Sequence, residues 1–146
     1  MIWRFIMDEV VSIEKSLRKI DNIIRKKGRE ILKDFSITPP QFIALQWLIS
    51  EGELTIGELS NKMSLACSTI TDLIDRMEKN NLVSRFKDEK DRRIVRVKVE
   101  EKGHKLVKDV LYRRQAYLGE KLRNFSDDEK KILSKNLIRL YEVMEE

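Results

Sequence analysis

The spacing of apolar residues changes twice along this chain, and that change constrains the fold more than any other feature. Up to residue 79, apolar residues recur every three or four positions, which is typical of helices that bury one face. Between residues 82 and 99 they recur every second position, which is typical of β-strands, and from Glu101 the helical spacing returns. The sequence therefore predicts helices on both sides of one short β-hairpin.

The predicted hairpin has a long charged tip. Its two strand-like runs are residues 82–87 and 94–99, and the tip DEKDRR occupies residues 88–93. Because successive side chains of a strand point to opposite faces, the second run should have one apolar and one polar face. The apolar face of this run is formed by Val95, Val97 and Val99.

Three short helices are predicted before the hairpin, each with a recognisable boundary. TPPQ at residues 38–41 provides a capping threonine, a proline at the first helical position and a glutamine that completes a capping box, and Gly52 ends this helix. TIGE at residues 55–58 is a second capping box. The third helix begins near Cys67 and stops at residues 80–81, because asparagine tolerates the left-handed conformation found at many helix ends.

Long helices are predicted at both ends of the chain, and each has an apolar face. The first helix carries an apolar stripe with heptad spacing, and a capping box at residues 126–129 opens the last helix. Such a stripe is buried best against other helices, including those of a second subunit, although the spacing also fits a helix packed within its own monomer. The candidate dimerisation residues are Ile6, Val10, Ile13, Leu17 and Ile20 in the first helix and Leu133, Leu137, Leu140 and Tyr141 in the last.

Composition argues against several classes of function. One cysteine cannot form an internal disulfide, and with one histidine it leaves no usual zinc site. The sequence shows neither a nucleophile–base pairing nor a phosphate-binding glycine loop, so we expect no catalytic activity and no cofactor. The apolar opening MIWRFIM is too short for a membrane span and lacks a cleavage site, so the cytoplasm is the expected compartment.

The positive charge of the chain is concentrated in the predicted hairpin. Residues 84–98 hold seven basic and three acidic residues, a net of four positive charges, and the formal net charge of the whole chain is +5. A charge that only keeps a protein soluble would be scattered, whereas a localised basic hairpin is typical of a surface that binds a polyanion. The candidate contacts in this hairpin are Arg85, Lys87, Lys90, Arg92 and Arg93.

Two short helices joined by a tight turn and followed by a hairpin describe a winged helix-turn-helix. The second helix suits the major groove of double-stranded DNA, and a basic hairpin can reach the backbone and the minor groove. The exposed serines and threonines of this helix could contact DNA, but these residue types also favour a helix N-terminus. For any one of them, DNA contact and helix-start preference have equal weight. We expect Asp75 to hold Arg76 or a wing arginine. The candidate contacts of this helix are Cys67, Ser68, Thr69, Thr71, Asp72 and Arg76.

Residues 59–103, from LSNK to EEKG, resemble the signature of the MarR (multiple antibiotic resistance regulator) family. The hallmark is an acid-rich wing tip that ends in Asp-Arg-Arg, matched here by Asp91, Arg92 and Arg93, with another aspartate three residues earlier. In that family a wing arginine enters the minor groove and an aspartate orients it. The resemblance implies this role for Arg92 or Arg93. It likewise implies that Asp91 or Asp88 is the orienting partner.

The chain departs from the family pattern at four positions. Ala66 stands where a serine often caps the recognition helix, and Cys67 replaces a commonly polar or basic residue. Asn81 replaces the usual glycine before the wing, and Glu100 replaces the threonine that usually caps the following helix. These departures concern individual DNA contacts and helix caps. Cys67 is expected to be a small, half-buried and inert residue, the alternative being a redox sensor at a helix N-terminus.

The resemblance covers almost the whole chain and implies a mainly α fold, in which a winged helix-turn-helix with a small β-hairpin lies between long dimerisation helices. We expect one domain over residues 1–146, with a DNA-binding lobe at 38–100 and a dimerisation region at 1–37 and 101–146. The implied function is sequence-specific DNA binding by a homodimer on an inverted repeat, as a repressor released by a small aromatic or anionic effector. Two alternatives stay open: a sequence-independent architectural DNA-binding protein, and a winged-helix protein-interaction module.

Overall fold

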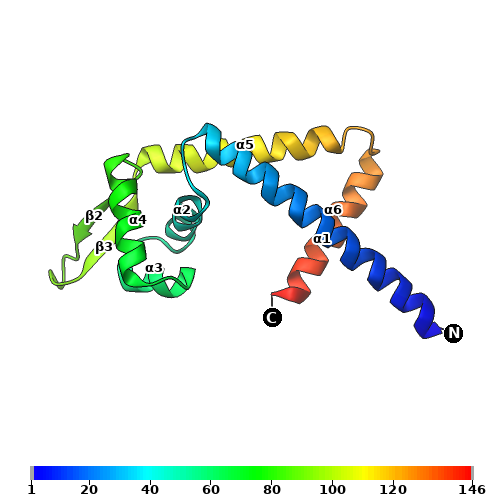
Figure 1. Ribbon diagram of the computed structural model, residues 1–146, viewed down its shortest axis with the longest axis horizontal. Helices are drawn as coiled ribbons and strands as arrows, with labels where there is room; N and C mark the ends of the chain where they lie inside the picture. Colours follow the sequence, from blue (N-terminus) through cyan, green and yellow to red (C-terminus); the bar gives the residue numbers. More distant parts are fainter. Residues whose placement is uncertain (1, 146) are drawn as a thin grey trace. The chain divides into compact units, whose positions relative to one another are not determined.

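The computed structural model describes residues 2–145, without the side chains of Phe5 and Ile6. Six helices and three strands follow one another along the described chain (Figure 1), and the predicted order of helices and hairpin is confirmed. The chain divides into two compact units, residues 1–112 and 113–146, and the boundary falls inside α5 (Glu101–Lys121). No helix within residues 2–145 has the length and apolar character needed to cross a membrane.

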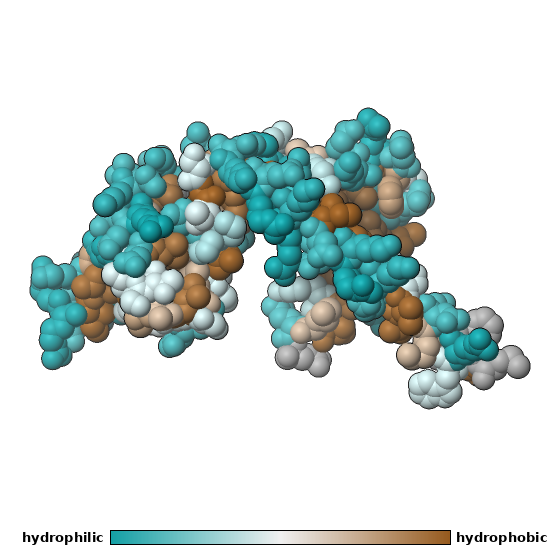
Figure 2. Space-filling view, in the orientation of Figure 1, coloured by the Kyte–Doolittle hydropathy of each residue, from teal (hydrophilic) through white to brown (hydrophobic). Residues whose placement is uncertain are grey.

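The first helix, α1 (Ile2–Asp34), joins the core of the first unit only at its C-terminal end. Ile31 and Leu32 are buried there. The heptad stripe that precedes them is exposed, and Figure 2 shows apolar atoms at the surface along this helix. Ile6, the first residue of the predicted stripe, lies outside the described side chains. The other four candidate residues of α1, each 38–54% exposed, are Val10, Ile13, Leu17 and Ile20.

The capping box predicted at the start of α2 (Pro39–Glu51) forms completely. The backbone N–H of Gln41 donates to Thr38 Oγ1 at 3.4 Å, and the backbone N–H of Thr38 donates to Gln41 Oε1 at 3.1 Å. These bonds satisfy donors that a helix start would otherwise leave unpaired. The helix ends at Gly52, whose φ of +82° is accessible to glycine without strain.

The second predicted capping box forms only in part. At the start of α3 (Ile56–Met63), the backbone N–H of Glu58 donates to Thr55 Oγ1 at 3.1 Å. The carboxylate of Glu58 does not complete the box, because it lies 3.7 Å from a guanidinium nitrogen of Arg96. The Glu58 side chain, which a complete capping box requires, is therefore engaged in a long-range ion pair with Arg96.

The third short helix, α4 (Cys67–Lys79), has the boundaries that its sequence predicts. Ala66 precedes it and supplies no side-chain cap. Asn81, two residues after the helix, has a φ of +61°, which confirms the predicted left-handed conformation. The turn between α3 and α4 is closed by the Ser60 hydroxyl, which donates to the carbonyl oxygen of Leu65.

A third strand joins the predicted hairpin. β2 (Val83–Lys87) and β3 (Val95–Val99) pair antiparallel, and β1 (Leu54–Thr55) pairs with the other edge of β3, so the order is β1-β3-β2. Leu54 lies opposite Val97, and both are buried. β1 escapes prediction from the sequence because a strand of two residues is too short to show an alternating pattern.

One hydrophobic core holds the first unit together, built from the C-terminal end of α1, from α2, α3, α4 and the sheet, and from the first turns of α5. Burying one such aliphatic side chain contributes about 1.5–3 kcal/mol. On α2, Ile49 is 39% exposed, whereas Ala44 is buried. The fully buried side chains include Leu45, Leu59, Ile70, Ile74, Met77, Val83, Val97 and Val110.

The second unit contains the end of α5 and α6 (Asp127–Met144). Its predicted capping box is complete, because Glu129 N–H donates to Ser126 Oγ at 3.1 Å and Ser126 N–H donates to Glu129 Oε1 at 3.0 Å. No described residue of α6 is buried. The four candidate dimerisation residues of this helix, half-buried or exposed, are Leu133, Leu137, Leu140 and Tyr141.

Gly103, in the first turn of α5, marks a close approach of two backbone segments. A Cβ atom at this position would lie 2.4 Å from the carbonyl oxygen of Leu82 and 2.7 Å from Val99 Cγ1. The same Leu82 oxygen accepts a hydrogen bond from Glu100 N–H at 2.9 Å. The two segments therefore cannot separate without weakening that bond.

We predict that Gly103→Ala lowers the free energy of unfolding by about 1–3 kcal/mol, because the added methyl overpacks a backbone contact. Gly119→Ala is the matched control: it lies in the same helix with nothing within 4 Å of the added atom, and we expect a gain of about 0.5–1 kcal/mol. Urea unfolding at one protein concentration measures both. Equal stability of the two variants would contradict the assigned contact.

Candidate nucleic-acid interface

All six residues of α4 that the sequence predicts for DNA contact lie at the surface of this helix. Ile70, Ile74 and Met77 are buried on one side of the helix. Helical spacing places Ser68 and Asp72 opposite that side, where nothing in the core reaches. The six predicted contacts of this helix, all exposed, are Cys67, Ser68, Thr69, Thr71, Asp72 and Arg76.

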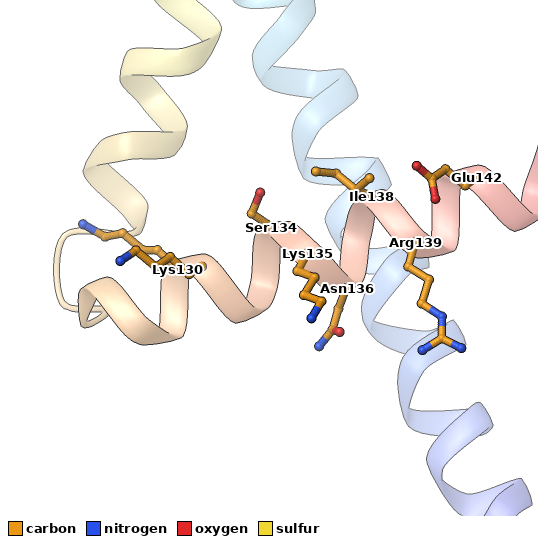
Figure 3. Close-up of a pocket in the computed structure, with 8 residues that line it drawn as sticks. Lys130, Ser134, Lys135, Asn136, Ile138, Arg139 and Glu142 are labelled. Atoms are coloured by element: carbon orange, nitrogen blue, oxygen red, sulfur yellow. The ribbon is translucent and has the colours of Figure 1, made fainter.

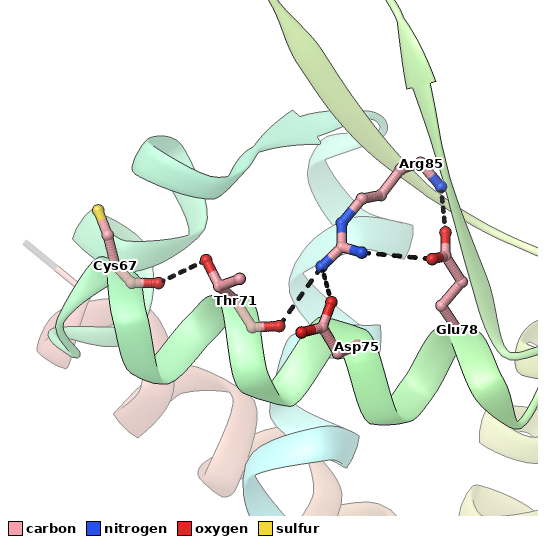
Figure 4. A network of polar contacts seen from close by, with 5 residues as sticks. All are labelled: Cys67, Thr71, Asp75, Glu78 and Arg85. Carbon is pink, nitrogen blue, oxygen red and sulfur yellow. Dashed lines mark hydrogen bonds and ion pairs between the residues drawn. The ribbon is translucent and has the colours of Figure 1, made fainter.

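One edge of α4 is joined to the wing, which we define as β2, β3 and their connecting loop at residues 88–94. Arg85 of β2 is paired with the carboxylates of Asp75 and Glu78, the second at 3.3 Å (Figure 4). Its backbone N–H donates to Glu78 Oε2 at 2.9 Å, and its guanidinium also donates to the Thr71 carbonyl oxygen at 3.4 Å. Asp75 therefore holds a wing arginine, one of the two partners expected for it.

These contacts give Arg85 a structural role that its sequence position does not predict. Its side chain is 27% exposed and its charge faces two carboxylates. The arginine is predicted from the sequence as a DNA contact, yet here it packs β2 against α4. The role of Glu78 escapes the sequence analysis, although a carboxylate three residues after Asp75 lies on the same helix edge and is a usable signal.

The hydroxyl groups of α4 differ in what they already bind. Thr71 Oγ1 donates to the Cys67 carbonyl oxygen at 2.9 Å, so its proton is used within the helix. Ser68 and Thr69 are exposed, and within residues 2–145 their hydroxyls have no hydrogen-bond partner. The hydroxyl groups of Ser68 and Thr69 are therefore free to donate to a base edge or a phosphate, whereas the Thr71 hydroxyl is already used.

The expectation of a half-buried Cys67 is wrong. The thiol is exposed at the first position of α4. Residues 64–69 are all exposed, because the first turn of α4 extends past the core and burial begins only at Ile70.

The contacts at the tip of the wing show which aspartate pairs with which arginine. Asp91 accepts two hydrogen bonds from the guanidinium of Arg93, both at 3.0 Å, and one from the backbone N–H of Arg93 at 3.1 Å. Asp88 instead contacts Arg96 at 3.4 Å. Arg92 is exposed, and no hydrogen bond or ion pair holds its side chain within the described residues. Asp91 and Arg93 are therefore the pair that has an aspartate orienting an exposed arginine.

The Asp91–Arg93 pair stays ionised at neutral pH. The hydrogen bonds from the Arg93 side chain, and then that from its backbone, lower the pKa of Asp91 below its ordinary value of 3.8, and the pKa of Arg93 is raised. When pairing lowers the pKa of a carboxyl group, the ion pair contributes fully to stability above the ordinary pKa. That contribution is lost as the pH falls through the lowered pKa. The orientation of Arg93 is therefore unaffected by pH changes near neutrality.

The remaining basic residues of the wing differ in what their side chains contact. Lys87 at the end of β2 and Lys90 in the loop are exposed, and their ammonium groups have no ion-pair partner within residues 2–145. Lys98 of β3 lies over the ring of Phe86, 5.6 Å from its centroid. Free positive charge therefore gathers at the loop end of the wing.

Comparison with known proteins agrees with this architecture. The MarR family model matches residues 37–95. The HTH-type transcriptional regulator YsmB of Bacillus subtilis (strain 168) is 53% identical over 138 residues, which is 94% of each chain. The HTH-type transcriptional repressor MdtR of the same organism is 28% identical over 84% of this chain and 79% of its own. The solved structure of a MarR family protein from Bacillus stearothermophilus is 50% identical with a TM-score of 0.83, over 94% of this chain and 96% of that one.

The similarity thus extends over the helices at both ends as well as over α4 and the wing. A winged helix-turn-helix with an exposed basic loop is a surface built for duplex DNA. The chain therefore belongs to the MarR family of DNA-binding transcriptional regulators.

Proposed function

We propose that the protein is a cytoplasmic, homodimeric repressor that recognises an inverted repeat, with α4 of each subunit in the major groove and each wing loop at the adjacent minor groove. The observation that carries the proposal is the Arg93 side chain. It is 91% exposed and held by Asp91 at the tip of the wing. An arginine presented in this way gains from the negative potential of a narrow minor groove.

The two contact elements supply different kinds of recognition. Phosphate contacts are blind to sequence, whereas contacts to base edges in the major groove discriminate. Lys87 and Lys90 suit the first kind, and Ser68 and Thr69 suit the second. This combination supports sequence-specific binding rather than purely architectural binding.

A second copy of the chain is the proposed cover for the apolar stripe of α1. A stripe of large exposed aliphatic residues exceeds what a monomer usually leaves in water. Its heptad spacing matches that of helices that pair with one another. The candidate residues of α6 add a further apolar face that the chain itself leaves without a buried residue. A twofold dimer then presents two α4 helices, which accounts for the inverted repeat.

Repression is the proposed sign of regulation, and similarity to the repressor MdtR supports it. Release by a small effector stays a prediction of the family resemblance. A groove along α6 is lined mainly by basic residues together with one carboxylate, Glu142, and Figure 3 shows Lys135, Asn136 and Arg139 extending to one side of the helix. That chemistry fits the anionic part of the expected effector. The basic residues of the groove are Lys130, Lys131, Lys135 and Arg139.

Selection of bound sequences from a random duplex pool tests the proposal directly. An enriched inverted repeat is the expected result, with affinity that falls steeply as salt rises. Weak and uniform binding would favour the architectural alternative instead. No binding to any duplex at low salt would favour the protein-interaction module.

Loss of the tip arginine should weaken DNA binding without unfolding the protein. We predict that Arg93→Ala lowers operator affinity by about tenfold or more, because a charge-assisted contact is lost. Arg92→Ala should also weaken binding, but less, because no hydrogen bond or ion pair from the described residues orients that side chain. Arg123→Ala is the control: this exposed arginine pairs with Glu120, outside the interface. Electrophoretic mobility shift titrations that give wild-type affinity for both wing variants would contradict the assignment.

The wing and α4 should fail in different ways when they are mutated. We predict that Lys87→Ala lowers operator and random-duplex affinity in parallel and reduces the salt slope by about one. Thr69→Ala should lower operator affinity selectively, by about 1–3 kcal/mol. Thr71→Ala should have a smaller effect, since its hydroxyl already bonds within α4. Both affinities are measured at several salt concentrations, and the scheme fails if Lys87→Ala affects only the operator.

Charge placed in the apolar stripe of α1 should separate the subunits. We predict that Leu17→Glu and Ile20→Glu convert the dimer to monomer in sedimentation velocity at micromolar concentration, because both side chains would be buried between subunits. Lys15→Glu, two residues from Leu17 and away from the stripe, should leave the dimer intact. A wild-type protein that sediments as a folded monomer would rule out this interface.

A further inference from the structure

Arg96 lies at the centre of the small sheet and contacts two carboxylates from separate elements. It is paired in the sheet with Thr55 of β1 and Phe86 of β2. Its Nη2 atom lies 3.4 Å from Asp88 Oδ2, and its Nη1 atom lies 3.7 Å from Glu58 Oε1. We call this set, Glu58–Arg96–Asp88, the Arg96 bridge.

The two ends of the bridge are each anchored in the backbone. Glu58 is in the first turn of α3, where its N–H donates to the side chain of Thr55. Asp88 joins the two ends of the wing loop, because its N–H donates to the Ile94 carbonyl oxygen at 2.9 Å. Its Oδ1 also accepts a hydrogen bond from Lys90 N–H at 3.1 Å within the loop. The bridge therefore joins the closed end of the wing loop to the helix-turn-helix.

We propose that Arg96 is a positioning residue: it holds the wing loop in a set place relative to α3, so that Arg93 is presented to DNA by a loop that is already ordered. Arg96 is 30% exposed and its charge faces two carboxylates, so it is not itself a phosphate contact. Where it concerns DNA, this inference rests on the proposed function.

The physical reason for such a bridge is the cost of ordering a loop on binding. A loop that must be immobilised by DNA loses conformational entropy at that moment, whereas one that is already held loses less. The Asp91–Arg93 pair orients the arginine within the loop, but it is internal to residues 88–94 and cannot place the loop. The Arg96 bridge supplies the missing connection.

Amide hydrogen exchange of the free, full-length protein tests the bridge without any DNA. We expect Arg96→Gln and Glu58→Ala to speed exchange in the loop by roughly two- to fivefold, the range of an exposed ion pair. Glu58→Ala changes only an exposed side chain of α3, so it remains informative if Arg96→Gln folds poorly. The amides to follow, each hydrogen-bonded in the loop, are Asp88, Lys90, Arg93 and Ile94.

Two control variants carry the same charge changes outside the bridge. Lys98→Gln removes a positive charge from the same strand, and Glu53→Ala removes a negative charge just before α3. Both should leave exchange of the loop amides at the wild-type rate. Faster exchange in the controls as well would overturn the proposal, because charge alone would then explain the effect.

The DNA affinity of Glu58→Ala distinguishes an effect of net charge from an effect of the Arg96 bridge, because the two predict changes in opposite directions. Removing a carboxylate makes the protein more positive, so electrostatics alone predicts that Glu58→Ala binds DNA more tightly, as expected for Glu53→Ala. The bridge predicts that Glu58→Ala binds roughly two- to fivefold more weakly, with an unchanged salt slope.

Three further results would overturn the proposal. The first is wild-type exchange in both bridge variants, and the second is tighter DNA binding by Glu58→Ala. The third is a salt slope reduced by about one in Arg96→Gln but not in Lys98→Gln, which would make Arg96 a phosphate contact. Failure of the wild-type protein to bind any duplex would refute the proposed function alone, since the exchange result would still decide whether the bridge holds the loop.

Discussion

The contact of Arg85 with Asp75 and Glu78 is the interaction on which the rest of the DNA-binding surface depends. It connects the edge of α4 to β2 through both a guanidinium and a backbone N–H. In the proposed complex, α4 and the wing enter different grooves of one duplex, which requires a set mutual position. The hydrophobic core holds these elements close together, but apolar packing is not directional. The ion pairs and hydrogen bonds, which have preferred geometry, add the orientation.

The charge of the wing is therefore less uniform than its composition indicates. Arg85 and Arg96 face carboxylates, and Lys98 lies over an aromatic ring. Lys87, Lys90 and Arg92 have no such partner within the described residues. Arg93 is paired yet almost fully exposed. Some cations of the wing thus hold its elements together, and the others are the ones that we propose as DNA contacts.

The helices at the two ends of the chain pose a different physical problem. α1 and α6 carry large apolar residues that the chain itself does not bury, while α2, α3 and α4 close around a complete core. Hydrophobic burial is the main favourable term in folding, so helices without a core gain little from standing alone. This asymmetry supports the proposed association through the end helices.

The sequence by itself determined the helices, their caps and the hairpin, because each depends on residues close together along the chain. The boxes at Thr38 and Ser126 and the left-handed Asn81 are local in this sense. Only the tertiary structure decided the partners of Asp75 and Asp88, the exposure of Cys67 and the existence of β1. The physical reason is that an ion pair or a two-residue strand depends on which distant segment is brought beside it, and neither the charge nor the spacing of one segment specifies that neighbour. The second capping box shows the competition directly, because the carboxylate that local sequence assigns to the helix start pairs with Arg96 instead.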